Sequence, residues 1–321
     1  MADRSFLMSH VRTQGLRGFE AGALMTPLAT KTGNGVTYVD RLSTAGLHAY
    51  FADDPEFDGN RVVEVDVVIA EGSSLAEAMH GRGPFDYAIA SHVIEHVPDL
   101  TGWLSELADL VRVGGQLLLL VPDKRYTFDY LRDLSSTADV VDAFVEGRKK
   151  PSPGRVFEHF ALGATVDAAT ACAGDIDPRA LERYGGVAAA LDLGPRSHRD
   201  GTYVDTHCWV VTPQRFLEVL GDLAELGILR WKLALFADTR PDEVDFGVVL
   251  ERASYFEPPD QVAQTFRGAI ERADQGTALD RALREVARLQ AEVDALRASR
   301  SWRLTQPARW LKRLTAGRLA G

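Results

Sequence analysis

The segment from Phe85 to Asp129, FDYAIASHVIEHVPDLTGWLSELADLVRVGGQLLLLVPDKRYTFD, decides the fold. Residues 85–90 are apolar and too few for a helix, which is typical of a buried parallel strand. After Pro98-Asp99, apolar residues recur at helical spacing and predict a helix that ends at Gly114-Gly115. Residues 116–121 form the next predicted strand, so the segment is a strand–helix–strand unit.

Polar residues follow both predicted strands. Ser91-His92 comes directly after the first strand, and Asp123 to Tyr126 comes after the second. In open α/β sheets, ligands bind outside the carboxyl ends of the strands. The segment therefore predicts a ligand site as well as a sheet.

The SHVIEH run at residues 91–96, the helix after it and the strand VGGQLLLLVPD resemble the second half of a class I S-adenosylmethionine-dependent methyltransferase. The similarity extends upstream, where residues 16–22, 36–40 and 62–73 resemble the first three strands of that family with their following loops. It is nearest to the branch found among bacterial polysaccharide-biosynthesis proteins. The resemblance implies an α/β fold with a doubly wound, mostly parallel, Rossmann-like sheet of seven strands.

Pattern and composition divide the chain into five segments. The core is interrupted by a stretch with alanine-rich runs and no convincing strand, which predicts a helical insertion. The core then resumes with a helix from Pro213 to about Leu226 and strands at 229–236 and 246–250. The predicted segments are 1–130 (S-adenosylmethionine-binding core), 131–204 (helical insertion, acceptor-side lid), 205–258 (completion of the core), 259–300 (helical or coiled-coil segment) and 301–321 (basic amphipathic tail).

The composition is that of an ordinary globular protein, with 45% hydrophobic and 26% charged residues in 321. The sequence contains no apolar run long enough for a transmembrane helix, and its start lacks the apolar core of a signal peptide. Cys172 and Cys208 are the only cysteines, which argues against a disulfide framework and a cysteine-rich zinc site. We therefore expect a cytoplasmic protein.

Charge is distributed unevenly along the chain. The net charge is −10, but residues 297–321 contribute +7 and no acid, so residues 1–296 carry −17. An acidic body is a poor binder of nucleic acid. No nucleic-acid partner is predicted, and the basic end needs its own explanation.

The resemblance implies S-adenosylmethionine as the cofactor, with acids after three successive strands as its contacts. Glu20 stands where the family places an acid near the methionine end, and Asp40 suits the two ribose hydroxyls. Glu71 aligns with the acid near the adenine, with Asp66 as a competitor for that place. A helix-capping role for Asp40 and a solvated surface role for Glu71 remain as alternatives.

The other predicted cofactor-binding residues are small or polar and lie in the same loops. A residue without a side chain lets the backbone approach a ligand closely, and a simple turn glycine is the alternative. The run EAGALMTP after the first strand departs from the fuller glycine-rich turn of the family, which puts cofactor binding there in doubt. The small or polar residues predicted to bind the cofactor are Gly22, Gly72, Ser73, Ser91 and His92.

His96 and His207 are the predicted catalytic residues. A hydroxyl acceptor benefits from a base, and histidine is the side chain that titrates near neutrality. For each of them, a packed structural histidine is the alternative. Asp123, Asp205 and His207 are conceivable metal ligands, but their spacing matches no metal signature, so no metal is predicted.

Arg125, Tyr126 and His159 are the predicted substrate-binding residues. Arg125 can bind a sugar or an anion through forked hydrogen bonds, and Tyr126 can stack on a pyranose face. A solvated loop in which Arg125 pairs with Asp123 is the alternative. His159 lies within the predicted insertion, where a packed histidine is the alternative.

The carboxyl-terminal part carries two further patterns. Apolar residues repeat every seven positions over residues 279–296, which predicts a short coiled coil and a homodimer, with an amphipathic helix lying on the body as the alternative. Trp302 and Trp310 stand among leucines and basic residues, a pattern that suits an interfacial helix on an anionic membrane. This ending resembles the tails of bacterial cell-surface polysaccharide glycosyltransferases, which implies a peripheral position on the inner face of the membrane and a glycosyltransferase partner.

The predicted function is methyl transfer from S-adenosylmethionine to a sugar hydroxyl of a polysaccharide precursor, with a glycan or sugar as acceptor. Two alternatives stay open. The chain could be a non-catalytic adaptor that keeps a degenerate methyltransferase fold to dock a glycosyltransferase, an interpretation supported by the EAGALMTP run. It could also methylate a small metabolite or a protein.

Overall fold

The computed structural model describes residues 4–32, 35–174, 176–241 and 243–273, together with positions 286, 289, 290 and 292. The chain forms two units, Met1–Ala269 and Ile270–Gly321, and the account below concerns the first. The predicted basic tail and, apart from those four positions, the predicted coiled coil at 279–296 lie outside the described residues.

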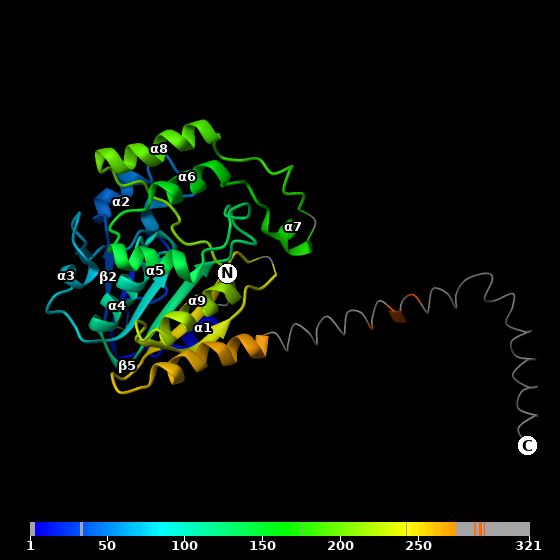
Figure 1. The fold of residues 1–321 in the computed structure, drawn as a ribbon. Helices are drawn as coiled ribbons and strands as arrows, with labels where there is room; N and C mark the ends of the chain where they lie inside the picture. Colours follow the sequence, from blue (N-terminus) through cyan, green and yellow to red (C-terminus); the bar gives the residue numbers. More distant parts are fainter. Residues whose placement is uncertain are drawn as a thin grey trace, which may run out of the picture. The chain divides into compact units, whose positions relative to one another are not determined.

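The centre of the first unit is a seven-stranded sheet in the order β3-β2-β1-β4-β5-β7-β6 (Figure 1). Neighbouring strands from β3 to β5 run parallel, and β7 runs antiparallel to both β5 and β6. The predicted doubly wound, mostly parallel sheet is confirmed. The strands are β1 (Arg17–Ala21), β2 (Gly35–Asp40), β3 (Val67–Val68), β4 (Phe85–Ser91), β5 (Val111–Pro122), β6 (Trp231–Ala237) and β7 (Asp245–Arg252).

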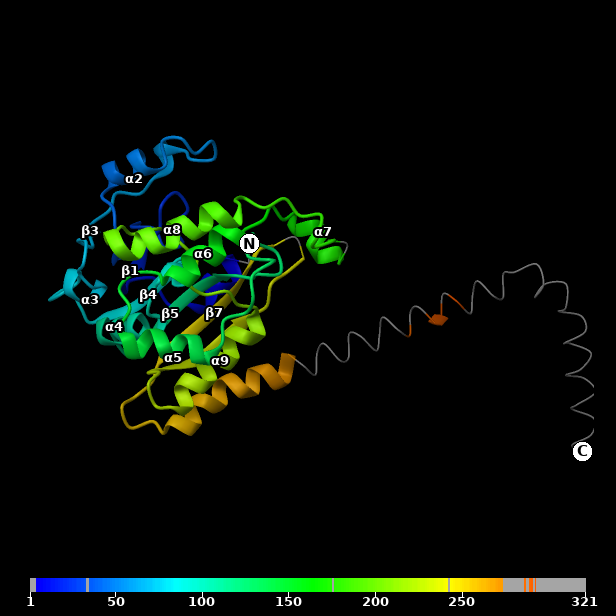
Figure 2. The same cartoon turned by 45° about the horizontal axis from the view of Figure 1, so that its top comes forward.

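Helices flank the sheet and form the insertion (Figure 2). Among the described residues, none of them is both long and apolar enough to cross a bilayer. The helices are α1 (Arg4–His10), α2 (Thr44–Tyr50), α3 (Leu75–Ala78), α4 (Leu100–Leu110), α5 (Thr137–Glu146), α6 (Pro153–Leu162), α7 (Ala168–Ala173), α8 (Val187–Asp200) and α9 (Pro213–Glu225), with 3-10 turns η1 (Gly59–Arg61) and η2 (Ile94–His96).

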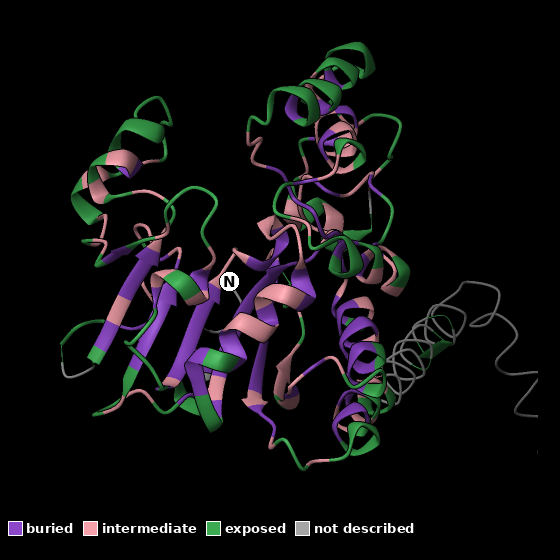
Figure 3. Cartoon of the chain, turned by 60° about the vertical axis from the view of Figure 1, so that its left-hand side comes forward, coloured by how far each residue is buried: buried purple, intermediate pink, exposed green. Residues whose placement is uncertain are grey.

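The sheet is buried on both faces, as Figure 3 shows by the purple of its strands. On one face α4 and α9 pack, with Phe216 of α9 edge-on to Phe246 of β7 at 5.6 Å between ring centroids. On the other face Leu7 of α1 lies directly over Gly247, where a Cβ would stand 2.2 Å from a Leu7 methyl. Burial on both faces explains why β4 and β5 read as continuous apolar runs.

The connection from β1 to β2 differs from the strand–helix–strand unit that was predicted for the segment from Phe85 to Asp129. Its described part, residues 22–32, contains no helix. Pro27 and the neighbouring glycines do not favour one, and Ala23 and Ala29 of the loop pack into the core in its place. Glu20 holds this loop, because its carboxylate accepts hydrogen bonds from the N–H groups of Leu28 (2.8 Å) and Ala29 (2.9 Å).

Two predicted element boundaries are wrong. The predicted third strand at 62–69 is reduced to Val67–Val68, because β3 pairs with β2 over two residues only. The helix predicted to end at Gly114-Gly115 ends at Leu110, and β5 begins at once. Gly114 (φ +73°) and Gly115 instead form an irregularity inside β5, where a Cβ on Gly115 would meet Val111 at 2.5 Å.

The insertion between β5 and α9 is helical, as predicted. It contains α5 to α8, and within its described residues the only β pairing is one isolated bridge between Ala164 and Arg183. In the insertion α6 packs against α8, while α5 contacts α4 and α9 of the core. Each of α5, α6 and α9 begins with a serine or threonine cap whose side chain accepts a backbone N–H, which fixes where the helix starts.

Candidate active site

The carboxyl end of β4 is a tight turn that brings three polar side chains together. His92 follows the last residue of β4 and has a left-handed backbone (φ +53°). Glu95 and His96 follow on the 3-10 turn η2, and the Asp99 side chain then caps α4 by accepting the Gly102 N–H at 2.8 Å. A left-handed histidine is uncommon, so the surrounding contacts must hold it.

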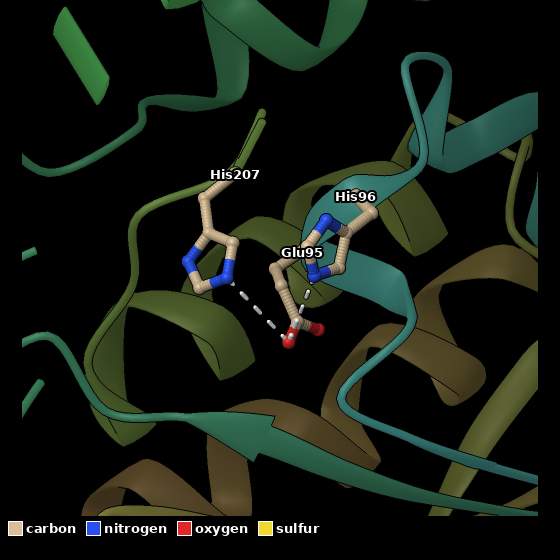
Figure 4. Close-up of side chains that lie close together, drawn as sticks. All are labelled: Glu95, His96 and His207. Atoms are coloured by element: carbon tan, nitrogen blue, oxygen red, sulfur yellow. Dashed lines mark ion pairs between the residues drawn. The ribbon is translucent and has the colours of Figure 1, made fainter. Parts of the chain in front are cut away.

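His207 completes a group that we call the histidine cluster: His92, Glu95, His96 and His207 (Figure 4 shows all but His92). Glu95 Oε1 lies 3.6 Å from His92 Nδ1, 3.9 Å from His96 Nε2 and 4.0 Å from His207 Nε2. Glu95 is 2% exposed, yet neither of its carboxylate oxygens accepts a hydrogen bond from any residue that the structure describes. Buried carboxylates are normally satisfied, so Glu95 is the exceptional group here.

Each histidine of the cluster carries an aspartate on its other ring nitrogen. His92 Nε2 lies 2.9 Å from Asp245, at the start of β7. His96 Nδ1 lies 3.1 Å from Asp205, and His207 Nδ1 lies 2.6 Å from Asp129. These pairs fix the orientation of all three rings, and the nitrogens left over face Glu95.

The segment that carries His207 is bonded directly to the turn after β4. The Cys208 N–H donates to the Glu95 carbonyl at 2.6 Å, and the Trp209 indole N–H donates to the Val97 carbonyl at 2.6 Å. Arg132, fully buried, donates to Asp129 (2.7 Å) and to the His207 carbonyl (2.9 Å). Segments far apart in the sequence are thus held in one place before any ligand arrives.

The pairs in the cluster shift the pKa values of their members. Burial would lower the pKa of His96, but the hydrogen bond to Asp205 and the charge of Glu95 outweigh it and raise the pKa. Burial would raise the pKa of Asp205, yet His96, Arg41 and Tyr203 bring it well below its usual range. The Asp129 pKa is lowered in the same way, by His207 and Arg132 against burial. The cluster therefore attracts positive charge.

The insertion contributes His159 of α6 to the wall of the cluster. Its Nδ1 accepts the His207 backbone N–H at 3.2 Å, and its ring lies edge-on to Phe128 at 5.4 Å. Burial, with the charges of His207 and Arg132, lowers the pKa of His159 to about 4. His159 thus packs behind His207, with a pKa that favours the neutral ring, and its predicted contact with a substrate remains a prediction.

The predicted ribose and adenine residues lie at the carboxyl ends of β2 and β3. Asp40 is the last residue of β2 and accepts the Leu42 N–H at 3.1 Å, while burial raises its pKa. Glu71, Gly72 and Ser73 form an exposed turn just after β3. Asp66, the competitor of Glu71, is occupied structurally, since it accepts the Tyr38 N–H at 2.9 Å and pairs with Lys31 at 2.6 Å.

Glu20 and Gly22 stand at the end of β1, beside β4. Glu20 is buried, and both of its oxygens accept N–H groups of the loop that follows. Gly22 has φ +67°, and a Cβ there would lie 2.6 Å from a methyl of Val93. Glu20 and Gly22 both have structural roles in the turn after β1, and their predicted contacts with a cofactor remain predictions.

Arg125 and Tyr126 follow β5 in the direction of the insertion. Arg125 Nε lies 3.0 Å from both carboxylate oxygens of buried Asp123. The Arg125–Asp123 pair, which was the alternative to substrate binding, is therefore present. The Arg125 guanidinium also lies 5.2 Å from the centre of the Tyr126 ring. Both side chains keep exposed surface next to the site.

Asp129 and Asp245 were not among the residues predicted for this site, and Glu95 was included only as part of the SHVIEH run. Glu95 could have been found from its place inside SHVIEH. Asp245 directly precedes a predicted strand, at an edge where sites form. A separate cavity of about 190 Å³ lies at the opposite edge of the sheet, lined by residues such as His10, Asp86 and Gln116, far from the cluster in the topology.

The parallel sheet with its reversed β7 and polar carboxyl edge defines a Rossmann-like α/β protein with the methyltransferase type of fold. Residues 31–159 match the family model of a methyltransferase domain. The matched part includes Asp40, Glu71 and the whole SHVIEH turn. Sequence and topology thus agree with the class I methyltransferase resemblance.

Solved structures are similar to this chain at low identity. The glycopeptide N-methyltransferase MtfA, complexed with sinefungin, is 16% identical over 38% of this chain and 54% of its own, about half its length (TM-score 0.27). An S-adenosylmethionine-dependent methyltransferase from Mesorhizobium loti is 15% identical over 78% and 98% (TM-score 0.39). A protein described as a putative zinc-dependent alcohol dehydrogenase from Rhodobacter sphaeroides is 13% identical over 78% and 90% (TM-score 0.42). Curated protein sequences gave no significant match.

Proposed function

We propose that this chain is an S-adenosylmethionine-dependent methyltransferase that transfers the methyl group to a hydroxyl oxygen of a sugar. The observation that carries the proposal is the match of residues 31–159 to a methyltransferase domain, within a sheet whose carboxyl edge bears the polar groups. The strand order reverses direction between β1 and β4, and ligands of such sheets bind at that point.

The cofactor is assigned to the β2 side of this point. Asp40 can accept hydrogen bonds from the two ribose hydroxyls, and the exposed turn at Glu71 can face the adenine. The sulfonium is already an activated donor. When the methyl transfers, its bond to sulfur breaks with the electron pair staying on sulfur, and a bond to the acceptor oxygen forms. The acceptor hydroxyl must lose its proton, and the protein must position the two reactants.

The acceptor is assigned to the β4–β5 side. The histidine cluster and its aspartates lie after β4, and Arg125 with Tyr126 lies after β5. His96 and His207 turn their Nε2 atoms toward Glu95. Polar and aromatic groups together suit a hydroxyl-rich acceptor such as a sugar. That the sugar belongs to a cell-surface polysaccharide rests on the sequence resemblance and on the basic tail.

Calorimetry with S-adenosylmethionine, followed by a release assay for S-adenosylhomocysteine over a panel of sugars, tests the proposal. We expect micromolar cofactor binding and turnover that requires a hydroxylated acceptor. Absence of binding at millimolar cofactor would overturn the enzyme assignment. Turnover only with amine or thiol acceptors would overturn the sugar assignment and leave the cofactor assignment intact.

A non-catalytic adaptor is the second candidate, and one observation favours it. The loop after β1 has no helix over residues 22–32, and Glu20 is bound to that loop. A degenerate first turn of this kind is what a fold kept for docking could tolerate. The calorimetry above separates the two candidates, because an adaptor has no need of the cofactor.

The basic tail adds a proposal about where the protein acts. A helix at 301–321 with basic residues and two tryptophans would bind anionic bilayers, next to a glycosyltransferase partner. Deleting residues 297–321 should abolish sedimentation with anionic vesicles and leave the weak sedimentation with neutral vesicles unchanged. Equal sedimentation of both chains would refute this part. Ultracentrifugation of a chain that ends at residue 278 tests the proposed homodimer through 279–296.

A further inference from the structure

We propose that the histidine cluster binds a divalent transition-metal cation, with Zn²⁺ as the reference ion, through Glu95, His96 and His207, next to His92. The spacing of these residues in the sequence predicted no metal. The proposal comes from their positions in space at the carboxyl end of β4.

The distances suit a cation. One ligand atom from each of Glu95, His96 and His207 lies within 4.8 Å of the others. Metal–ligand bonds of about 2.0–2.2 Å place neighbouring ligand atoms about 3–4 Å apart. The distances from Glu95 Oε1 to His96 Nε2 (3.9 Å) and His207 Nε2 (4.0 Å) fall in this range. His92 Nδ1 lies 3.6 Å from the same oxygen. Small side-chain rotations would complete the coordination.

The chemistry of the four groups points the same way. An aspartate beside one ring nitrogen holds the N–H there and leaves the lone pair on the other nitrogen, the arrangement found behind metal-binding histidines. All three rings have such an aspartate: Asp245, Asp205 and Asp129. The lone pairs then face the carboxylate of Glu95, to which no side chain or backbone group in the described part of the chain donates a hydrogen bond. Acceptors converging on a buried anion repel one another unless a positive charge lies between them.

The local charge balance also favours a cation of charge +2. The cluster contains four carboxylates, counting Glu95 and the three aspartates, and among the described residues the guanidinium groups of Arg132 and Arg41 contact them. With neutral imidazoles, these six charged groups sum to −2. A divalent cation neutralises this charge.

The ligand set selects the class of metal, and the exposure of its members indicates an open site. Two imidazole nitrogens and one carboxylate suit zinc and its neighbours, whereas magnesium and calcium prefer oxygen. The Glu95 and His207 side chains are 2% and 7% exposed, but those of His92 and His96 are 37% and 31% exposed. One side of the cation would thus face solvent, as in sites that bind substrate.

A role in catalysis follows only if the proposed methyl transfer is correct. On the open side, the cation would bind the acceptor hydroxyl and lower its pKa, so that the proton passes to water before the methyl arrives. His96 and His207 would then be ligands rather than bases. Metal binding itself does not depend on this step.

Calorimetry with ZnCl2 on the full, chelator-treated chain, without cofactor or acceptor, tests the proposal. We expect one Zn²⁺ per chain and, with Co²⁺, visible absorption from the bound ion. His96→Ala combined with His207→Ala should weaken binding at least a hundredfold, and Glu95→Gln at least tenfold. Asp205→Asn, a positioning residue, should weaken it about 10–100-fold. His80→Ala, an exposed histidine elsewhere, should have no effect.

Lack of stoichiometric binding, or equal binding by the double variant, would overturn the metal and leave an imidazolium–carboxylate network as the explanation. Circular dichroism checks that each variant folds, and Glu95→Gln keeps the shape of the side chain if the double variant does not fold. Zinc binding without cofactor binding would refute the methyltransferase proposal alone. Cofactor binding without zinc would refute the metal alone.

Discussion

The two sides of the candidate site are built in different ways. On the β2–β3 side, Asp40 ends β2 and Glu71 lies in the turn after β3, and Asp40 accepts a hydrogen bond from a backbone N–H two residues away. On the β4 side, the histidine cluster draws on segments after β4, after β5, before α9 and at the start of β7, all joined by hydrogen bonds. One side is local, whereas the other is assembled from distant segments around the buried Glu95 and His207.

The difference indicates which side is formed before ligands bind. Buried charged groups are tolerated only where partners hold them, so the cluster must be fixed as a unit. The Asp40 side can adjust to a ligand because little is packed on Glu71 and its neighbours. We expect mutations on the β4 side to lower stability and mutations on the Asp40 side to lower affinity.

Arg132→Met gives the largest expected effect. It removes a fully buried guanidinium and leaves Asp129 without its cationic partner, and breaking such a pair costs about 3–5 kcal/mol. Urea unfolding followed by circular dichroism measures the loss in the free energy of unfolding. Arg112→Ala is the matched control, since its ion pair with Asp86 is exposed and should cost only about 0–1 kcal/mol. Equal losses in the two variants would show that burial does not make the Arg132–Asp129 pair more costly to break than an exposed pair.

Gly22→Ala tests whether the turn after β1 is set by packing. The left-handed backbone costs a non-glycine residue about 1–2 kcal/mol, and the added Cβ would also meet Val93 at 2.6 Å. Adding Val93→Ala should recover part of the loss, with a coupling energy of about 0.5–1 kcal/mol in a double-mutant cycle of unfolding free energies. Strict additivity would show that Val93 does not restrict this position.

The sequence predicted the sheet because each of its strands is a local pattern. The apolar runs at 85–90 and 116–121 and the helix starting at Pro213 needed no information from elsewhere in the chain. The helix-free loop after β1 could also have been read locally, since Pro27 interrupts a run that has glycines near both ends. The same loop also resembles a glycine turn, and this resemblance masked the signal from Pro27.

The histidine cluster could not be predicted in the same way. His92, Glu95 and His96 are adjacent in the sequence, but their partners Asp129, Asp205 and Asp245 follow at long and irregular separations. These residues meet because β7 turns back beside β5 and because the insertion returns across the end of β4. No spacing rule encodes such a crossing, so the histidines could be predicted from the sequence but Asp129 and Asp245 could not.

Asp40→Asn should lower the affinity for S-adenosylmethionine and leave stability nearly unchanged. A hydrogen bond to a charged acceptor is worth about 1.5–3 kcal/mol, which corresponds to a loss of about 10–100-fold in the dissociation constant by calorimetry. Glu71→Gln, in the exposed turn, is the comparison and should cost less. A larger loss for Glu71→Gln would move the main cofactor contact from the ribose to the adenine.

The pH dependence of that affinity gives the smallest expected effect and identifies Asp40 directly. Burial raises the pKa of Asp40 above its usual 3.8, although its backbone hydrogen bonds oppose the shift. Cofactor binding needs the ionised carboxylate, so affinity should fall as the pH is lowered toward this raised pKa. Without cofactor, the free energy of unfolding changes with pH in the opposite direction. The folded chain holds the Asp40 proton more tightly than the unfolded chain does, so the stability that this proton contributes is lost as pH rises through the raised pKa. Asp40→Asn should show neither change, and a wild-type affinity that does not vary across mildly acidic pH would exclude Asp40 from the cofactor site.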